Sequence, residues 1–262
     1  MRAQKKIVNH TPETSKNRVV QMHNQRIESH DLDPDLLYIS RQIAFTNPTT
    51  LRQALPGHWA LFRFHDIKPN SLSFTSQLGH TQLQGNVYVF LPANTLIEWH
   101  FRPEIFSYES FTSFAPMDTP TPQYPVVIPF HKPHKLEHHR DIIDFLIHSG
   151  LREMSPSATT PYVPHKVKKF FDVHFTEDIP LAAITKDLRM SHMTMTSKFK
   201  AQFGVTPVQY RNALRTFEAK RLLRNKHSVT EAGLMAGFTS MTQYNHHFHM
   251  TFNHAPSIAT KL

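Results

Sequence analysis

One arrangement of serine, phenylalanine and polar residues occurs twice near the end of this 262-residue chain. The first copy occupies residues 191–204 (SHMTMTSKFKAQFG) and the second occupies residues 240–253 (SMTQYNHHFHMTFN). In each copy a serine that can cap a helix precedes two phenylalanines, which fall at the same positions of both copies. The chain therefore builds one short helical unit twice. A pair of such units suits a long periodic ligand such as duplex DNA, which repeats about every 10 to 10.5 base pairs.

The distribution of charge supports a nucleic-acid ligand. Residues 162–262 contain 14 Lys and Arg against 6 Asp and Glu, whereas residues 1–161 contain 15 against 14. Nearly all of the formal net charge of +9 therefore lies in the part of the chain that holds the repeated helices. This is the electrostatic pattern of a module that neutralises phosphates, although a solvated basic face without a ligand is the alternative.

Length and composition favour two soluble domains. The chain is 39% hydrophobic and 11% aromatic, which is enough for true cores. It contains no cysteine, which excludes disulfides, thiolate metal sites and cysteine nucleophiles and is compatible with a reducing cytoplasm. No segment has the apolar run of a signal peptide or a membrane-spanning helix, so we expect a cytoplasmic protein without a membrane partner.

The N-terminal half predicts a mainly β domain. Residues 1–34 are polar and are expected to form an arm. From residue 35 onward, short runs of β-branched and aromatic residues alternate with Pro, Gly and Asn, as in NVYVFLPANTLIEWHF. Many short strands at close spacing indicate a barrel or a sandwich, and we assign residues 35–152 to this domain.

A helix and a linker are expected to close the β domain. Leu136, Ile143, Leu146 and Ile147 recur with a helical period and share one face. That face either packs on its own barrel or forms a dimerisation surface with a second chain. Residues 153–162 are small, polar and proline-bearing, which is typical of a linker.

Three groups of spaced residues follow this linker. They are Ser191…Phe199-Lys200…Phe203-Gly204-x-x-Pro207-x-x-Tyr210, then Arg215…Ala219…Leu222-Leu223, then Val229-x-Glu231…Gly237-Phe238…Phe248…Phe252…Pro256. In this order they resemble the DNA-binding domain of the AraC/XylS family of transcription regulators, over roughly residues 163–260. For residues 163–262 the resemblance implies an all-α domain with two helix-turn-helix units joined by a central helix at about 207–224. It also implies that the β domain is a cupin-like sensor and dimerisation barrel.

The sequence departs from the family pattern at several turns. Thr185 and Arg189 stand where the family usually has a small alanine and a turn glycine, and Gly233 replaces an alanine. Asn253 replaces a glycine, and residues 259–260 replace a Tyr-Arg pair. Asparagine tolerates the left-handed conformation, whereas arginine in a turn puts the geometry of the first unit in question.

The resemblance also implies which side chains meet DNA. Recognition helices are expected at about 191–203 and 240–252, and the base-reading candidates on them are Met193, Thr196, Ser197, Met241, Thr242, Asn245 and His246. None is Arg or Lys, the commonest partners of guanine, so we expect A·T-rich sites with Asn245 on adenine.

Basic residues around these helices are the candidates for phosphate contacts. They are Lys198, Lys200, Arg211, Arg215, Arg221 and Lys226. For Arg215 and Arg221 a structural pairing with Glu218 or Glu231 is the alternative. His246 and His247 would gain charge beside phosphates, which predicts a DNA affinity that rises as pH falls.

Together these features predict a sequence-specific transcription regulator whose N-terminal domain senses a small effector or the dimer state. Double-stranded DNA, RNA polymerase and a second copy of the chain are its expected partners, with no cofactor, no metal and no enzyme activity. Alternatives are a regulator that acts by protein contact alone, a nucleoid-type binder with little sequence preference, and a metal-cupin enzyme with a DNA-binding tail. The last would use His58, His65, His80 and His100 as ligands, although no His-x-His with a following carboxylate is present.

Overall fold

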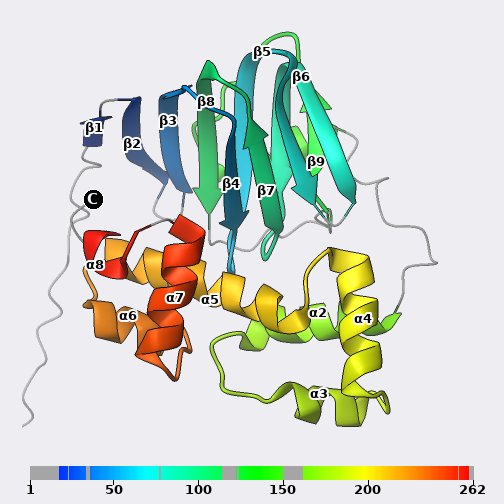
Figure 1. The fold of residues 1–262 in the computed structure, drawn as a ribbon. Helices are drawn as coiled ribbons and strands as arrows, with labels where there is room; N and C mark the ends of the chain where they lie inside the picture. The colour runs from blue at the N-terminus through cyan, green and yellow to red at the C-terminus, as the bar shows by residue number, and fades with distance from the viewer. Residues whose placement is uncertain are drawn as a thin grey trace, which may run out of the picture.

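The computed structural model places a β domain above a helical domain, with the long helix α5 running along one end of the sheet (Figure 1). It describes residues 18–22, 24–33, 36–76, 78–113, 122, 124–149, 162–252 and 254–259. The strands are β1 (Arg18–Met22), β2 (Gln25–Asp33), β3 (Leu36–Phe45), β4 (Thr49–Ala54), β5 (Trp59–Ser76), β6 (Gly79–Leu91), β7 (Leu96–Phe101), β8 (Glu104–Ser113) and β9 (Val126–Pro129). The helices are α1 (His139–His148), α2 (Tyr162–His174), α3 (Leu181–Asp187), α4 (His192–Phe203), α5 (Pro207–Arg224), α6 (Val229–Met235), α7 (Met241–Phe252) and α8 (Pro256–Ala259). The expectation of a β-rich N-terminal part and an all-α C-terminal part is confirmed.

The strands form one antiparallel sheet that folds over on itself. Its main path runs β1-β2-β3-β8-β5-β6-β9, and β7 pairs with both β4 and β5. The fold-over occurs within β5, whose register against β6 shifts twice between Phe64 and Leu72. As a result the first half of β5 pairs with β8 and its second half pairs with β7. Such irregularities bend a strand and let a sheet curl.

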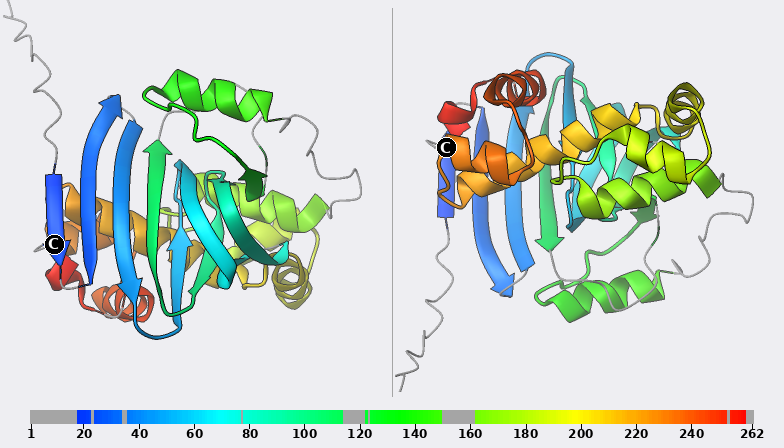
Figure 2. Two further views of the ribbon diagram at one scale, coloured as in Figure 1. Left: turned by 90° about the horizontal axis from the view of Figure 1, so that it is seen from above. Right: turned by 90° about the horizontal axis from the view of Figure 1, so that it is seen from below.

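Alternation along the strands gives the sheet a buried core on each face. On β5 and β6, Phe62 and Val89 point into an aromatic core between the two halves of the sheet, whereas Leu61 and Tyr88 point to the opposite face. Helix α1 covers that opposite face, as Figure 2 shows beside the sheet. The interior between the two halves is therefore filled by side chains, and phenylalanine and tryptophan rings supply much of the filling.

Helix α1 packs on its own sheet through Ile142, Phe145 and Leu146, all of which are buried. Of the residues assigned to a dimerisation face, Leu136 and Leu146 lie in this intramolecular core. Ile143 and Ile147 are only partly buried. Leu136 and Leu146 therefore pack within their own chain, and their assignment as dimer contacts was wrong.

The sheet begins earlier in the chain than the sequence indicated. Residues 18–22 and 25–33, which were expected in a polar arm, form β1 and β2, and β2 pairs with β3. Their polar composition hid them, because strands at the edge of a sheet tolerate charged and polar side chains. The remaining expectations for residues 1–17 and for the linker up to residue 161 lie outside the described residues.

The helical domain consists of two helix-turn-helix units, α3–α4 and α6–α7, joined by α5. Local signals start and stop these helices: Ser191 accepts a hydrogen bond from the Thr194 amide, and Gly204 ends α4 in the left-handed conformation at φ 73°. Each unit has its own apolar core, and α5 contributes to both. Among the helices that the structure describes, none is long and apolar enough to span a membrane.

Candidate nucleic-acid interface

The two expected recognition helices, α4 and α7, lie near opposite ends of α5 and on the same side of it. Figure 1 shows their axes roughly parallel, and the view from below in Figure 2 shows both nearly end-on. A pair of parallel helices carried on one side of a common helix has the arrangement needed to enter two successive major grooves.

Helix α4 turns an apolar stripe inward and a polar face outward. Met195, Phe199 and Phe203 are buried in the first core. Of the predicted base readers, Met193 is 81% exposed and Ser197 is exposed, so both remain available to a ligand. Thr196 is only partly buried, yet its hydroxyl oxygen is buried without a hydrogen-bond partner among the described residues.

Helix α7 has the same organisation. Tyr244 and Phe248 are buried, whereas Thr242, Asn245 and His246 are exposed as expected of base readers. Met241 is an exception. It is partly buried and packs against the second core, so a structural role competes with base reading.

The outward faces of α4 and α7 also hold side chains that sequence reasoning did not select. They are His192 on α4 and Gln243, His249 and Met250 on α7. Met250 is 68% exposed, which is unusual for a long apolar side chain. The helical period alone could have identified them, because they share a face with the selected residues.

The departures from the family pattern have local explanations. Arg189 adopts the left-handed conformation at φ 50°, so the turn of the first unit forms without glycine. Thr185 is buried and its hydroxyl donates to the Ala182 carbonyl at 3.0 Å, which satisfies it internally. At Gly233 a Cβ atom would lie 2.8 Å from the Tyr244 ring, so the alanine of the family pattern would not fit beside this tyrosine. Asn253 lies outside the described residues.

The segment between α2 and α3, residues 175–180, braces the two units. Arg215 of α5 is buried and donates through Nε to the Phe175 carbonyl at 2.5 Å and through a terminal nitrogen to the Glu177 carbonyl at 2.7 Å. Arg211 donates to the Ile179 carbonyl at 2.6 Å. We call residues 175–180 the α2–α3 connection.

The second unit contacts the same connection through its turn. Gly237 lies between α6 and α7 at φ 92°, and a Cβ atom there would come within 2.2 Å of the Thr176 carbonyl oxygen. Only glycine allows this approach of two backbones. The relative placement of α4 and α7 therefore rests on the contact of the second unit with the α2–α3 connection as well as on α5.

These contacts correct part of the expected phosphate set. Arg211 is half-buried over the Phe171 ring, and Arg221 pairs with Glu218, the structural alternative considered for it. Arg215 is also structural, but its partners are carbonyls of the α2–α3 connection and not Glu218 or Glu231. Tertiary contacts, which the sequence does not show, turned Arg211 and Arg215 inward, whereas Arg221 pairs with a neighbour on its own helix. The remaining members, Lys198, Lys200 and Lys226, are exposed, and their phosphate role stays a prediction.

His247 is held by a contact within the protein. Its Nε2 atom lies 3.0 Å from the Asn212 amide nitrogen of α5, which fixes the ring between helices. Burial, followed by the neighbouring charge of His246, lowers the pKa of His247. We therefore no longer expect His247 to make DNA affinity depend on pH. For His246, which is exposed, that expectation stays a prediction.

The histidines considered as cupin metal ligands do not converge. His65 contacts Glu109 at 3.1 Å, and His58 lies in the loop before β5 with Nδ1 2.9 Å from the Pro56 carbonyl oxygen. Only His80 and His100 are neighbours, with ring centroids 5.8 Å apart. Within the described ranges no cluster of three potential ligands could hold a metal ion.

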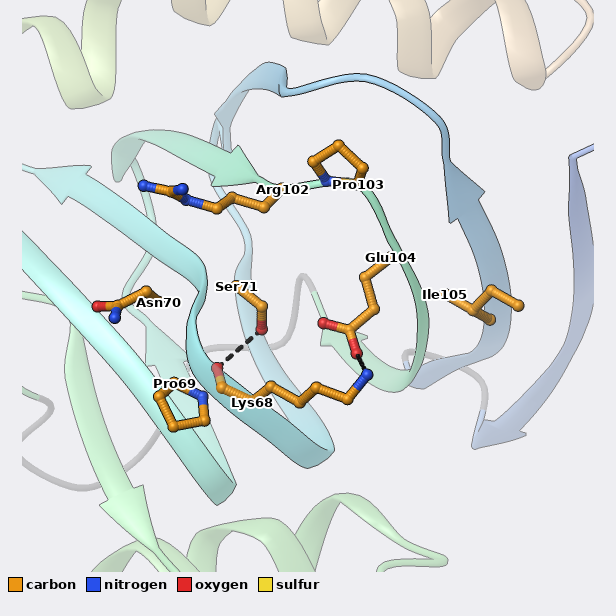
Figure 3. A pocket seen from close by; sticks show the side chains of 8 residues that line it. All are labelled: Lys68, Pro69, Asn70, Ser71, Arg102, Pro103, Glu104 and Ile105. Carbon is orange, nitrogen blue, oxygen red and sulfur yellow. Dashed lines mark hydrogen bonds and ion pairs between the residues drawn. The ribbon is translucent and has the colours of Figure 1, made fainter.

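Two adjoining open hollows lie in the β domain, and both are lined by polar and apolar side chains. One of about 650 Å³ lies between the irregular segment of β5 and the β7–β8 turn (Figure 3). In it Lys68 pairs with Glu104, and the Arg102 side chain extends along the wall. An adjoining hollow of about 550 Å³ reaches His80 and His100.

The two domains touch where α5 meets the end of the sheet. Ala54 of β4 is 1% exposed and lies in the core of the first helix-turn-helix unit, with Leu96 of β7 packed against that core. Tyr210 of α5 donates to the Asn94 carbonyl of the β6–β7 loop at 2.7 Å. The sequence motif that contains Tyr210 gave no sign of this contact, because its partner lies 116 residues away.

Comparison with known proteins agrees with this geometry. A family model described as a helix-turn-helix domain matches residues 184–261. The HTH-type transcriptional activators RhaS of Salmonella schwarzengrund and Salmonella arizonae are each 31% identical over 93 residues, which cover 35% of this chain and 34% of theirs. The chain thus matches about a third of the length of these curated relatives. Its C-terminal region is a helix-turn-helix domain of the AraC type, as the sequence motifs predicted.

Solved structures extend the likeness to both domains. ToxT from Vibrio cholerae has a TM-score of 0.55 at 11% identity, over 87% of this chain and 98% of that protein. A structure of the same protein described as bound to an unsaturated fatty acid has a TM-score of 0.52 at 13% identity, over 92% of this chain and 97% of that one. At this identity the comparison shows a common two-domain fold.

Proposed function

We propose that this chain, whose residues 184–261 match a helix-turn-helix family model, is a sequence-specific DNA-binding transcription regulator. The observation that carries the proposal is the pair of roughly parallel helices, α4 and α7, held on one side of α5 with their polar faces outward. The RhaS activators, to which this domain is similar, support the assignment to transcription.

In this proposal α4 and α7 enter successive major grooves. Asn245 and Ser197 are exposed on the outward faces and contact base edges, and Met193 contacts thymine methyl groups. Lys198 and Lys200 on α4 and Lys226 after α5 contact phosphates. A·T-rich sites remain the expected preference, because the outward faces offer no arginine to guanine.

The proposal is tested by separating base contacts from phosphate contacts. Binding of full-length protein to sites selected from random DNA is compared with binding to bulk DNA at fixed salt. We expect Asn245→Ala to lose about 1–3 kcal/mol on the selected site only, and Lys200→Ala to weaken both DNAs alike and to lower the salt dependence. If Asn245→Ala lowers affinity for both DNAs equally, Asn245 does not read bases, and selected sites rich in G·C would refute the expected preference.

We further propose that an anionic amphiphile acts as the effector at the boundary of the two domains. ToxT, which shares this fold, has been solved with an unsaturated fatty acid bound. In this chain the α5 residue Lys220 lies with Nζ 4.1 Å from the Phe252 ring centroid, and burial together with Arg224 and Arg41 lowers its pKa to about 8. The Nε of Arg41 on β3 is also buried without a hydrogen-bond partner among the described residues. An anion between β3 and α5 would compensate the positive charges of Lys220 and Arg41.

Thermal denaturation in the presence of an unsaturated fatty acid or its methyl ester tests this effector. We expect the acid to raise the melting temperature and the ester to leave it unchanged, because only the acid carries a charge. Lys220→Met should abolish the shift, whereas Lys226→Met, which removes an exposed lysine, should preserve it. Equal shifts with acid and ester, or in wild type and Lys220→Met, would contradict an anion site at Lys220.

A further inference from the structure

The hydroxyl group of Tyr210 lies between two oxygen atoms at the domain boundary. Its oxygen is 2.7 Å from the Asn94 carbonyl oxygen of the β domain and 2.5 Å from Oδ1 of Asp172 on α2. Tyr210 is 2% exposed, so water has little access to this group. A phenol has one hydrogen, and both neighbours are acceptors when Asp172 is ionised. With Asp172 ionised, one of these two short contacts therefore lacks a hydrogen of its own.

The surroundings hold both oxygen atoms in place. Asn94 adopts φ 59°, its amide nitrogen donates to the Leu55 carbonyl at 2.7 Å, and its side-chain oxygen accepts from the Gly57 amide at 2.8 Å. These contacts fix the direction of the Asn94 carbonyl. Asp172 is fixed in turn by Lys168, one turn earlier on α2, whose ammonium donates to Oδ2 at 2.8 Å.

Few titratable groups act on Asp172. Lys168 faces it from its own helix, and Tyr210 faces it from α5. The β6–β7 loop contributes only the backbone carbonyl of Asn94 to this cluster. The protonation state of Asp172 therefore decides how the single phenolic hydrogen is used.

We propose that Asp172, Tyr210 and the Asn94 carbonyl form a proton-operated latch between the DNA-binding domain and the β domain. With a proton on Oδ1, Asp172 donates to the Tyr210 oxygen and Tyr210 donates to the Asn94 carbonyl. Each of these two contacts then contains one hydrogen. When that proton leaves for solvent, Tyr210 donates to the carboxylate, which is the stronger acceptor, and the contact with Asn94 weakens. The latch goes beyond DNA recognition, because it joins the two domains. The Tyr210 ring also packs against Phe199 of the recognition helix α4, with ring centroids 5.8 Å apart.

The direction of the pH dependence follows from the site. Burial raises the pKa of Asp172 above its ordinary value of 3.8, and it outweighs the opposing effects of Lys168 and the Tyr210 hydrogen bond. Because only the protonated carboxyl gives both short contacts of Tyr210 a hydrogen, proton binding and the contact with Asn94 favour each other. The latch is therefore fully formed below the ordinary aspartate pKa and is lost as pH rises through the raised one.

The absence of cysteine makes a direct test possible in the full chain. Gln84 on β6 and Ala201 on α4 are exposed, so a cysteine at each can carry a fluorescent label, one label per domain. The distribution of interdomain distances is then measured by single-molecule energy transfer from about pH 7.5 down to about pH 3.5, below the ordinary aspartate pKa. We expect the wild-type distribution to narrow as pH falls.

Two variants separate the latch from other titrations. Asp172→Asn supplies an N–H donor at every pH and should stay narrow throughout, whereas Tyr210→Phe should stay broad throughout. Both keep all 20 histidines, so a histidine effect would persist in them. A pH response that survives in Asp172→Asn, or a wild-type distribution equal to that of Tyr210→Phe at both ends of the range, would overturn the proposal.

A second measurement uses only the wild-type chain, so it does not depend on whether the variants fold. Carbon-13 NMR of the Asp172 carboxyl group in the wild-type chain should give a pKa above that of an ordinary aspartate. A pKa at or below the ordinary value would overturn the latch whatever the variants do. Neither measurement involves DNA, so the latch can fail while the proposed DNA binding stands, and the reverse.

Discussion

Replacement of Gly237 by alanine tests whether the two helix-turn-helix units are held by direct contact. The new Cβ atom would lie 2.2 Å from the oxygen, 2.6 Å from the carbonyl carbon and 2.7 Å from the Cα of Thr176. All three are backbone atoms of the α2–α3 connection, so no side-chain rotation can relieve the overlap. The turn between α6 and α7 must instead move away from the connection.

Gly204 provides the matched control. It has a similar left-handed conformation at φ 73°, but nothing lies within 4 Å of the Cβ that alanine would add. Gly204→Ala should therefore cost only the left-handed penalty of about 1–2 kcal/mol. Part of this cost is offset, because alanine loses less conformational entropy on folding than glycine does. Gly237→Ala carries the same penalty plus overpacking of about 1–3 kcal/mol. We expect a total near 3 kcal/mol for Gly237→Ala and near 1 kcal/mol for Gly204→Ala.

Urea denaturation of the full chain measures both free energies of unfolding, and binding to a selected DNA site follows in the same samples. The Gly237→Ala variant should also lose DNA affinity at temperatures where it remains folded, because α7 is displaced relative to α4. Equal losses of stability in the two variants would refute the reasoning that the turn presses on Thr176.

Three further predictions concern single residues. Arg189→Gly should raise the free energy of unfolding by about 0.5–1 kcal/mol, because glycine relieves the left-handed strain at φ 50°; thermal denaturation with no gain would contradict this. Arg215→Met should lower stability by about 2–3 kcal/mol, since two carbonyls of the α2–α3 connection lose charged donors; a loss confined to DNA affinity would instead restore its phosphate role. Although burial opposes it, hydrogen bonds from Arg63 and His65 lower the pKa of Glu109 to about 2. Ionised Glu109 should therefore contribute up to about 3 kcal/mol to the free energy of unfolding at pH values above its ordinary pKa of 4.5, and this contribution should be lost as pH falls through about 2. Denaturation of wild type and Glu109→Gln is measured across this pH range. A difference in stability between them that does not change with pH would contradict the prediction.

The sequence predicted those features of the helical domain that depend on local chemistry. Ser191 and Gly204 mark the ends of α4 because capping and left-handed turns need only neighbouring residues. The inward turn of Arg211 and Arg215 could not be read in this way, since their partners are carbonyls of a distant segment. Whether a basic side chain faces phosphate or protein is decided by tertiary burial.

The same distinction holds at other positions. Gly233 looked like a departure from a pattern until Tyr244 was found in the space of the missing methyl group. Strands β1 and β2 were not predicted because strands at a sheet edge tolerate charged and polar side chains. The contact of Tyr210 with Asn94 joins two domains and had no signal in either segment alone.

The spacing of protected grooves on DNA tests the central claim most directly. Hydroxyl-radical footprinting of the full chain on a selected site, combined with methylation interference, locates each groove that the protein enters. Two helices carried on one side of α5 should protect two major-groove segments about 10 to 10.5 base pairs apart on one face of the duplex. Protection of a single groove, or of two grooves on opposite faces, would contradict the account.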